Sequence, residues 1–237
     1  MNSNEKSILS IKNVSVIYRN GTIETVAVKD LSMDIFSSGI TVIMGKSGSG
    51  KSSLLNVIGG MKCPDAGSVI FEGRDISQYS DKELTCFRRD KVGFVFQNYN
   101  LLGSLTALEN VNIAATLTKD AMSPSEMLNL VGLEGMSGKY PRQLSGGEQQ
   151  RVCIARAIVK NAGMLLCDEP TGALDTENSG KVVAILERIS IQHKIPLVIV
   201  THNPDFLKIA SHYIIMRNGE ITEEKFNPCP MCAKDVF

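Results

Sequence analysis

The sequence predicts a mixed α/β fold, and three observations predict it. The apolar run 40–44 leads directly into the glycine-rich segment 45–53, and short apolar runs alternate with helical patterns between residues 163 and 200. Residues 8–36 instead show the period-two alternation that is typical of antiparallel strands. We therefore expect a doubly wound α/β core that is preceded by an antiparallel β subdomain.

Composition and charge exclude several classes of protein. The chain has 237 residues, and 25 lysines and arginines balance 25 aspartates and glutamates. Without a net positive charge, nucleic acid is not expected as the main ligand. No apolar run approaches the roughly 20 residues of a membrane helix, and residues 1–7 lack the apolar core of a secretory signal. We expect a cytosolic chain that forms one large α/β domain.

The first elements are a hairpin and a strand. Residues 8–18 and 25–36 alternate apolar and polar side chains on either side of a turn at Asn20-Gly21, which predicts two paired strands. The β-branched run 40–44 predicts a buried strand that ends at Gly45.

The segment after this strand has the spacing of a phosphate-binding loop, or P-loop. In Gly-x-x-x-x-Gly-Lys-Ser, backbone N–H groups and the positive end of a helix converge on phosphate oxygens. Lys51 adds a cation near the β- and γ-phosphates, and Ser52 is the expected Mg²⁺ ligand. The predicted phosphate-binding residues are Gly45, Lys46, Ser47, Gly48, Ser49, Gly50, Lys51, Ser52 and Ser53.

The remaining elements complete a P-loop nucleoside triphosphatase (NTPase) core that is interrupted by helices. Residues 68–71 and 92–96 read as strands that flank a helix at 81–89, and residues 97–142 read as an inserted α-helical subdomain with helices at 108–117 and 125–130. The core then resumes with a helix at 148–159, a strand at 163–167, a helix at 176–191, a strand at 197–200 and a hairpin around Asn218-Gly219. The predicted core therefore covers 8–96 and 143–224, and 225–237 form a C-terminal tail.

Two adjacent carboxylates follow the apolar strand at 163–167. The carboxyl ends of parallel strands share one edge of the sheet, so Asp168 is expected to hold Mg²⁺ through water beside Ser52. Glu169 points differently and can orient or deprotonate the water that attacks the γ-phosphate, as a general base.

A second anion-binding helix start is predicted at Leu144-Ser145-Gly146-Gly147-Glu148. A single nucleotide has no obvious need for two such sites, so this segment is a candidate to reach the nucleotide of another copy. Ser-Gly-Gly-Glu also fits an ordinary helix cap with a capping box, and the sequence alone leaves both readings open.

The P-loop, Leu-Ser-Gly-Gly-Glu-Gln-Gln-Arg at 144–151 and Asp-Glu-Pro-Thr-Gly at 168–172 together resemble the ATP-binding subunit of an ATP-binding cassette (ABC) transporter. The resemblance covers residues 8–224. It implies an ATPase that hydrolyses ATP in line with Mg²⁺, and a head-to-tail dimer that sandwiches two ATP molecules between the P-loop of one copy and the signature residues Leu144, Ser145, Gly146, Gly147 and Glu148 of the other.

The resemblance also implies roles for four further residues. Tyr18 matches the aromatic residue that stacks on adenine, and Gln97 matches the Q-loop residue that senses Mg²⁺ and the attacking water. Asp175 matches the D-loop, which contacts the opposite subunit, and His202 matches the switch histidine at the γ-phosphate. Catalysis would then rest on Glu169, His202 and Lys51, and Mg²⁺ binding on Ser52, Gln97 and Asp168.

A narrower resemblance, carried by 93–102 and 105–111, is to the macrolide-exporter and lipoprotein-release branch. It implies an integral membrane permease subunit with an extracytoplasmic domain as partner, and a peripheral location on the cytoplasmic face of the plasma (inner) membrane. The expected cargo is a peptide, lipoprotein or antibiotic. The alternatives are a regulatory ABC ATPase that acts on a cell-wall enzyme without transport, and an ABC ATPase that acts on nucleic acid or ribosomes.

The tail contains a pair of cysteines with the spacing of a metal or redox site. Cys229-Pro-Met-Cys232 supplies only two ligands. Three readings stay open: a loose tail with two free thiols, zinc shared between two chains, and a disulfide.

Overall fold

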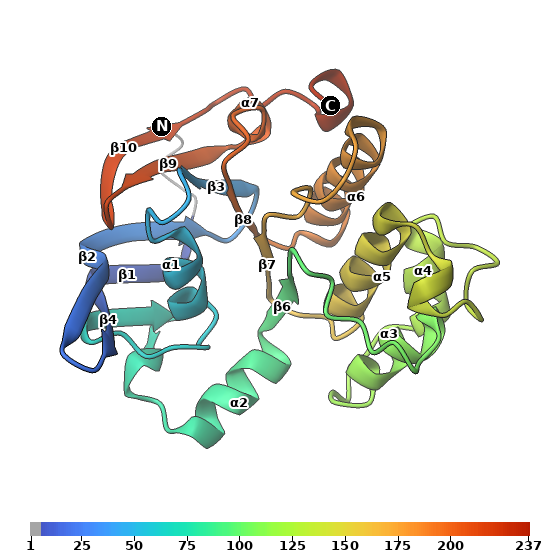
Figure 1. Ribbon diagram of the computed structural model, residues 1–237, viewed down its shortest axis with the longest axis horizontal. Helices are drawn as coiled ribbons and strands as arrows, with labels where there is room; N and C mark the ends of the chain where they lie inside the picture. Colours follow the sequence, from blue (N-terminus) through green and yellow to red (C-terminus); the bar gives the residue numbers. More distant parts are fainter. Residues whose placement is uncertain (1–5) are drawn as a thin grey trace.

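An antiparallel sheet forms the N-terminal part of the fold. The computed structural model describes residues 6–237 (Figure 1). The sheet has the strand order β2-β1-β4-β5, and its strands are β1 (Ser7–Asn20), β2 (Ile23–Phe36), β4 (Ala66–Phe71) and β5 (Arg74–Asp75). The register between β1 and β2 shifts near Asn13, which adopts a φ of 51°. This bulge lets the inward-facing side chains before and after it stay in the core.

The second sheet is built mainly from parallel strands. Its order is β10-β9-β3-β8-β7-β6, and all neighbours are parallel except β9 and β10. The strands are β3 (Ile40–Gly45), β6 (Val92–Val95), β7 (Met164–Asp168), β8 (Leu197–Thr201), β9 (His212–Arg217) and β10 (Glu220–Phe226). Their carboxyl ends bring the segments that follow β3, β6, β7 and β8 to one edge, as the sequence predicts.

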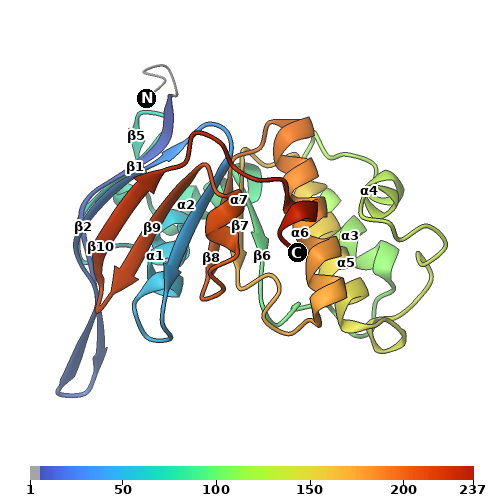
Figure 2. The same cartoon turned by 90° about the horizontal axis from the view of Figure 1, so that it is seen from above.

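Alternate side chains of these strands enter two different cores. On one face, Ile43 and Leu166 pack with α1 (Lys51–Ile58) and the antiparallel sheet. On the other face, Val42 and Leu165 pack with α5 (Gly146–Ile158) and α6 (Thr176–His193). Figures 1 and 2 show α1 between the two sheets and α6 across the second sheet from it.

The segment 97–142 folds as helices that pack on α5. The segment contains α3 (Ala107–Ala115) and α4 (Pro124–Leu130). Two helices lie outside it: α2 (Asp81–Asp90), which precedes β6, and α7 (Phe206–Ile209), which follows β8. Three short 3-10 helices are η1 (Ile76–Gln78), η2 (Pro141–Gln143) and η3 (Ala233–Asp235). Val111 of α3 and Leu128 of α4 belong to the same apolar cluster as the buried residues of α5 and β7. The helical segment therefore shares its core with the sheet.

Helix starts are set by side-chain caps. Ser80, Thr106 and Ser145 each form a capping box with the glutamate three residues later. Because Ser145 is the N-cap, α5 begins at Gly146, two residues before the start that apolar periodicity predicts. Within residues 6–237, no helix combines the length and the apolar character that crossing a bilayer requires.

The tail is ordered rather than loose, which corrects one expectation. Ala233 is fully buried, and its N–H donates to Oε1 of Glu187 in α6 at 2.9 Å. The Phe237 ring packs edge-on against Phe206, with the ring centroids 4.9 Å apart. The tail therefore docks on α6 and α7, as the red C-terminal end shows in Figure 2.

Candidate active site

The P-loop joins β3 to the start of α1. Gly50 caps the helix with a φ of 98°, and a Cβ there would lie 2.0 Å from the carbonyl oxygen of Ala27. Gly48 also has a positive φ, of 78°, but a Cβ there would meet no atom within 4 Å. The loop is thus tightly held at its helix end and open at its tip, where an anion can approach the backbone N–H groups.

Two buried polar side chains of the loop fit a bound phosphate. Lys51 is only 7% exposed, and its Nζ donates to the carbonyl of Lys46 at 2.9 Å. Burial lowers the pKa of Lys51, while Glu169 and Asp168 act in the opposite direction. The buried Ser49 Oγ has no hydrogen-bond partner in the structure. A buried hydroxyl without a partner and a desolvated ammonium are both satisfied by phosphate oxygens.

A distant hairpin supports the P-loop. The N–H of Gly219, in the turn between β9 and β10, donates to the carbonyl of Ser49 at 3.1 Å. The carbonyl of Gly219 in turn accepts from the N–H of Lys29 in β2 at 2.9 Å. The sequence predicts this turn but not its role. Ser49 and Gly219 are 170 positions apart in the chain (219 minus 49), and no local pattern indicates a contact between such distant residues.

Asp168 lies beside the start of α1, where the predicted Mg²⁺ site would be. Ser52 Oγ donates to Asp168 Oδ1 at 3.2 Å. Burial raises the pKa of Asp168, and the hydrogen bond from Ser52 opposes this rise. A partly desolvated carboxylate next to a hydroxyl is a donor set that suits a hard, oxygen-binding cation such as Mg²⁺.

Glu169 adopts an unusual backbone conformation next to Asp168. Its φ is 47°, in the left-handed region, which a residue other than glycine enters at a cost of about 1–3 kcal/mol. The two adjacent acids have different partners, since Asp168 accepts from Ser52 and Glu169 lies against His202. Glu169 Oε1 lies 2.9 Å from Nδ1 of His202, and the side chain of Glu169 is 15% exposed against 66% for His202. The structure therefore brings together the predicted base and the predicted switch histidine.

Gln97 follows β6, and its loop is fastened to α5. Tyr99 and Asn100 both have positive φ values, 51° and 52°. The guanidinium of Arg156 donates to both of their carbonyls, at 2.8 and 2.6 Å, and the Sγ of Cys153 donates to the carbonyl of Tyr99 at 2.9 Å. The side chain of Gln97 reaches Gly172, in the loop after Glu169. A Cβ added at Gly172 would lie only 3.0 Å from Gln97 Nε2.

The sequence gives no local signal for the role of Arg156. Two strained residues in succession persist only where surrounding contacts hold them, and Arg156 supplies such contacts. Burial also raises the pKa of Cys153 to about 12, so this thiol stays a neutral donor. Arg156 therefore ties the loop of Gln97 to the helix that starts at the predicted signature.

Replacing Arg156 by Lys is expected to lower kcat while ATP affinity is unchanged. An ammonium cannot reproduce the two-pronged contact of a guanidinium, so the loop of Gln97 loses its fixed position. We expect about a tenfold loss of kcat, or roughly 1.4 kcal/mol. Arg89→Lys, at an exposed pair with Asp90, is the matched control. Steady-state kinetics and calorimetric ATP binding test this, and a raised Kd for ATP with an intact kcat would contradict it.

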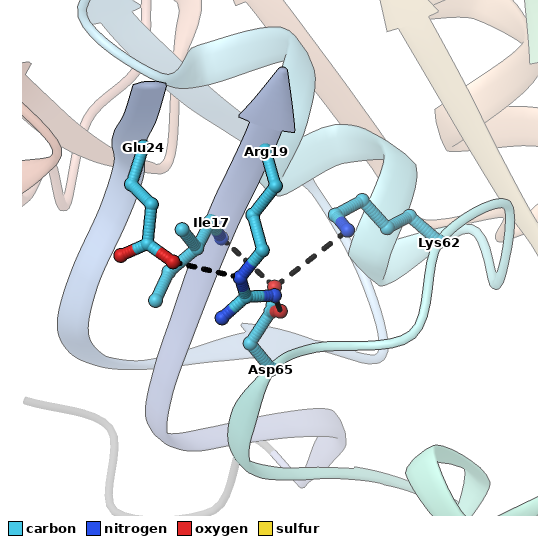
Figure 3. A network of polar contacts seen from close by, with 5 residues as sticks. All are labelled: Ile17, Arg19, Glu24, Lys62 and Asp65. Atoms are coloured by element: carbon cyan, nitrogen blue, oxygen red, sulfur yellow. Dashed lines mark hydrogen bonds and ion pairs between the residues drawn. The ribbon is translucent and has the colours of Figure 1, made fainter. Parts of the chain in front are cut away.

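Tyr18 lies on β1. Its two neighbours in the sequence, Ile17 and Arg19, belong to a polar network around Asp65 (Figure 3). Asp65 accepts from the N–H of Ile17 at 2.8 Å and from Arg19 Nη1 at 2.9 Å. The bond from Ile17 is the largest cause that lowers the pKa of Asp65, so this carboxylate remains charged at neutral pH. Tyr18 is 45% exposed as a residue, and Lys62 Nζ lies over one face of its ring, 5.1 Å from the centroid. A flat, accessible aromatic face is suited to stacking on a base.

The signature segment is not joined to the P-loop of its own chain. Ser145 Oγ accepts from the N–H of Glu148 at 3.3 Å, and Glu148 Oε2 accepts from the N–H of Ser145 at 2.7 Å, so the capping box is present. In residues 6–237, no hydrogen bond or ion pair links 144–148 to 45–53. Figures 1 and 2 show α5 and α1 on opposite sides of β7. Asp175 caps α6 by accepting from the N–H of Asn178 at 2.8 Å.

The loop at the end of β3, the two acids at the end of β7 and the histidine after β8 define the class of protein as a P-loop NTPase. The chain belongs to the ABC transporter family: the family's sequence model, described as ABC transporter, matches residues 28–172. It is an ATP-binding and ATP-hydrolysing cassette of that family.

Relatives and solved structures agree with this family. A putative ABC transporter ATP-binding protein of Mycoplasma pneumoniae is 40% identical over 98% of this chain and 50% of its own length. The macrolide export ATP-binding/permease protein MacB of Marinobacter nauticus is 39% identical over 92% of this chain and 35% of its own length. The chain thus spans half or less of these two proteins. A dimeric structure of the cassette MJ0796 in a post-hydrolysis state, bound to ADP and Pi, matches with a TM-score of 0.85 and 37% identity, covering 92% of this chain and 98% of that one.

Proposed function

We propose that two copies of this chain form a head-to-tail dimer with two ATP molecules bound between them. In this proposal, the cycle of ATP-dependent dimerisation and hydrolysis drives a separate membrane protein. One observation carries the proposal. Among residues 6–237, the P-loop and the capped helix start at Ser145 share no hydrogen bond or ion pair, so the helix start is not used at the P-loop of its own chain. Each ATP would then lie between the P-loop of one copy and Ser145 and Gly147 of the other.

In this proposal, hydrolysis follows from the placement of the residues at the sheet edge. Glu169 orients the attacking water and accepts its proton, since its carboxylate lies at the end of β7 beside the loop. Lys51 stabilises charge on the transferred phosphoryl group, and His202, released from Glu169, does the same from the opposite side. Ser52, Asp168 and Gln97 would hold Mg²⁺, which neutralises charge on the β- and γ-phosphates when it is bound.

Removal of Mg²⁺ with EDTA is expected to stop ATP hydrolysis while ATP still binds. The loop N–H groups and Lys51 hold the phosphates without the metal, but the developing charge is no longer neutralised. Phosphate release and binding of a fluorescent ATP analogue measure the two effects separately. Returning MgCl₂ should restore the rate, and full turnover in EDTA would contradict the proposed roles of Ser52 and Asp168.

For the partner, we propose a membrane permease with an extracytoplasmic domain, of the macrolide-export or lipoprotein-release kind, with the cassette on the cytoplasmic face of the membrane. Similarity to MacB supports the branch. Three apolar residues of the segment 97–142 are exposed by about half: Leu102 (47%), Ile113 (46%) and Leu117 (56%). Exposed apolar side chains that gather on one segment mark interaction sites.

The test is co-purification with a membrane permease of the macrolide-export or lipoprotein-release kind, co-expressed from the same organism. The triple variant Leu102→Asp/Ile113→Asp/Leu117→Asp is expected to lose the complex and to keep its affinity for ATP, because none of the three residues is among the predicted nucleotide-binding residues. Ile191→Asp, at a 70% exposed position on α6, is the matched control and should keep the complex. Retention of the complex by the triple variant would place the partner elsewhere.

A further inference from the structure

The C-terminal tail presents two thiols on a loop that is fixed at both ends. Before the loop, the N–H of Asn227 donates to the carbonyl of Ser211 at 2.8 Å. Within it, the N–H of Met231 donates to the carbonyl of Lys208 at 2.9 Å, and the buried Ala233 follows directly. Cys229 and Cys232 are nevertheless exposed and free. The backbone that carries the thiols is therefore held in place while the thiols face solvent.

The donors on this loop are all soft. Between Cys229 and Cys232 lies Met231, a residue with a thioether side chain that is 47% exposed as a whole. Among residues 6–237, no group of three or more histidine, cysteine, aspartate or glutamate side chains is placed to hold a metal ion. The part of the chain that the structure describes therefore does not bring together the four ligands of a structural tetrahedral zinc site. Soft thiolate and thioether donors bind Cu(I), zinc and iron–sulfur clusters, and of these Cu(I) needs the fewest ligands, since two thiolates suffice.

We propose that Cys229 and Cys232 bind one Cu(I) ion per chain, with Met231 beside them as a further soft donor. Binding replaces two S–H protons by the metal, so two protons are released and no electron is transferred. The anchored backbone limits the ordering that binding requires. The inference is independent of the proposed function, because the tail lies outside the nucleotide site, and either can fail without the other.

The test is an anaerobic titration of the full chain, reduced beforehand, with Cu(I) held by the coloured chelator bicinchoninate. The wild type is expected to withdraw one equivalent of Cu(I) per chain. The double variant Cys229→Ser/Cys232→Ser should lose this uptake by at least about 100-fold in affinity. Cys63→Ser removes a different exposed thiol and should bind as the wild type does. Because all three substitutions are at exposed positions, equal thermal unfolding curves will show that the fold is kept.

Three results would overturn the proposal. Equal uptake by the wild type and the double serine variant would place the metal elsewhere. No uptake by the reduced wild type would show that the loop does not hold Cu(I). Half an equivalent of zinc per chain, lost in the double variant and accompanied by a dimer mass in native mass spectrometry, would show a zinc bridge between two copies instead.

Discussion

Glu169→Gln is expected to lower ATP turnover by about 10²- to 10⁴-fold while ATP binding is retained. The amide has the size of the carboxylate and can keep a hydrogen bond to His202, which lies 2.9 Å away, but it cannot accept a proton from water. The phosphate-binding side of the site, Lys51 and the loop N–H groups, is unchanged. ATP that binds and is not hydrolysed should hold two chains together, so a stable dimer is expected.

Three measurements on the same variant check this expectation. Phosphate release gives the turnover, calorimetry gives the affinity for ATP, and light scattering with and without ATP gives the mass. Glu177→Gln is a matched control, since Glu177 is an exposed residue of α6 that pairs with Lys181. Normal turnover in the Glu169 variant would show that another group accepts the proton.

The arrangement of the sheet edge could be predicted because it depends on local patterns and one geometric rule. Short apolar runs predict the parallel strands, and parallel strands place their carboxyl ends together. For this reason the positions of Asp168 at the end of β7 and His202 after β8 follow from the sequence. Their hydrogen bonds do not, since no local pattern indicates the pairing of His202 with Glu169 or the positive φ of Glu169.

Other parts of the site depend on contacts that leave no local pattern. The turn at Gly219 supports Ser49, and Arg156 holds the carbonyls of Tyr99 and Asn100, across long stretches of chain. The docked tail is a similar case, because Phe237 packs on Phe206. A short polar segment that ends in one aromatic residue does not indicate which surface it will cover.

The role of the Ser145 segment could not be predicted from the sequence for a different reason. Its sequence fits both a helix cap and an anion-binding site, and the fold is compatible with both roles. A serine at a helix N-cap accepts the first free N–H groups, and the remaining N–H groups still point outward. The capping box with Glu148 therefore does not exclude an anion at the same helix end. Only an experiment on two chains can separate a cap from a site that acts in trans.

The composite site predicts that two defective chains can complement each other. In the Glu169→Gln background, Lys51→Ala should fail to form a dimer because the loss of a charged contact weakens ATP binding by about 10- to 100-fold. Ser145→Arg should bind ATP and also fail, because the side chain blocks the partner's phosphate. A one-to-one mixture contains one intact pair, the P-loop of the Ser145 variant with the signature of the Lys51 variant. ATP should therefore restore a dimer in the mixture alone.

This result would distinguish the two roles of Ser145, because a residue that acted only as a cap would be defective in its own chain and could not be complemented. Glu109→Ala, which breaks the same kind of capping box at the start of α3, is the control and should still form the dimer with ATP. Light scattering at increasing protein concentration measures the dimer fraction. A mixture that stays monomeric where the Glu109 control dimerises would contradict a site shared between two chains, and the helix start at Ser145 would then be a cap alone.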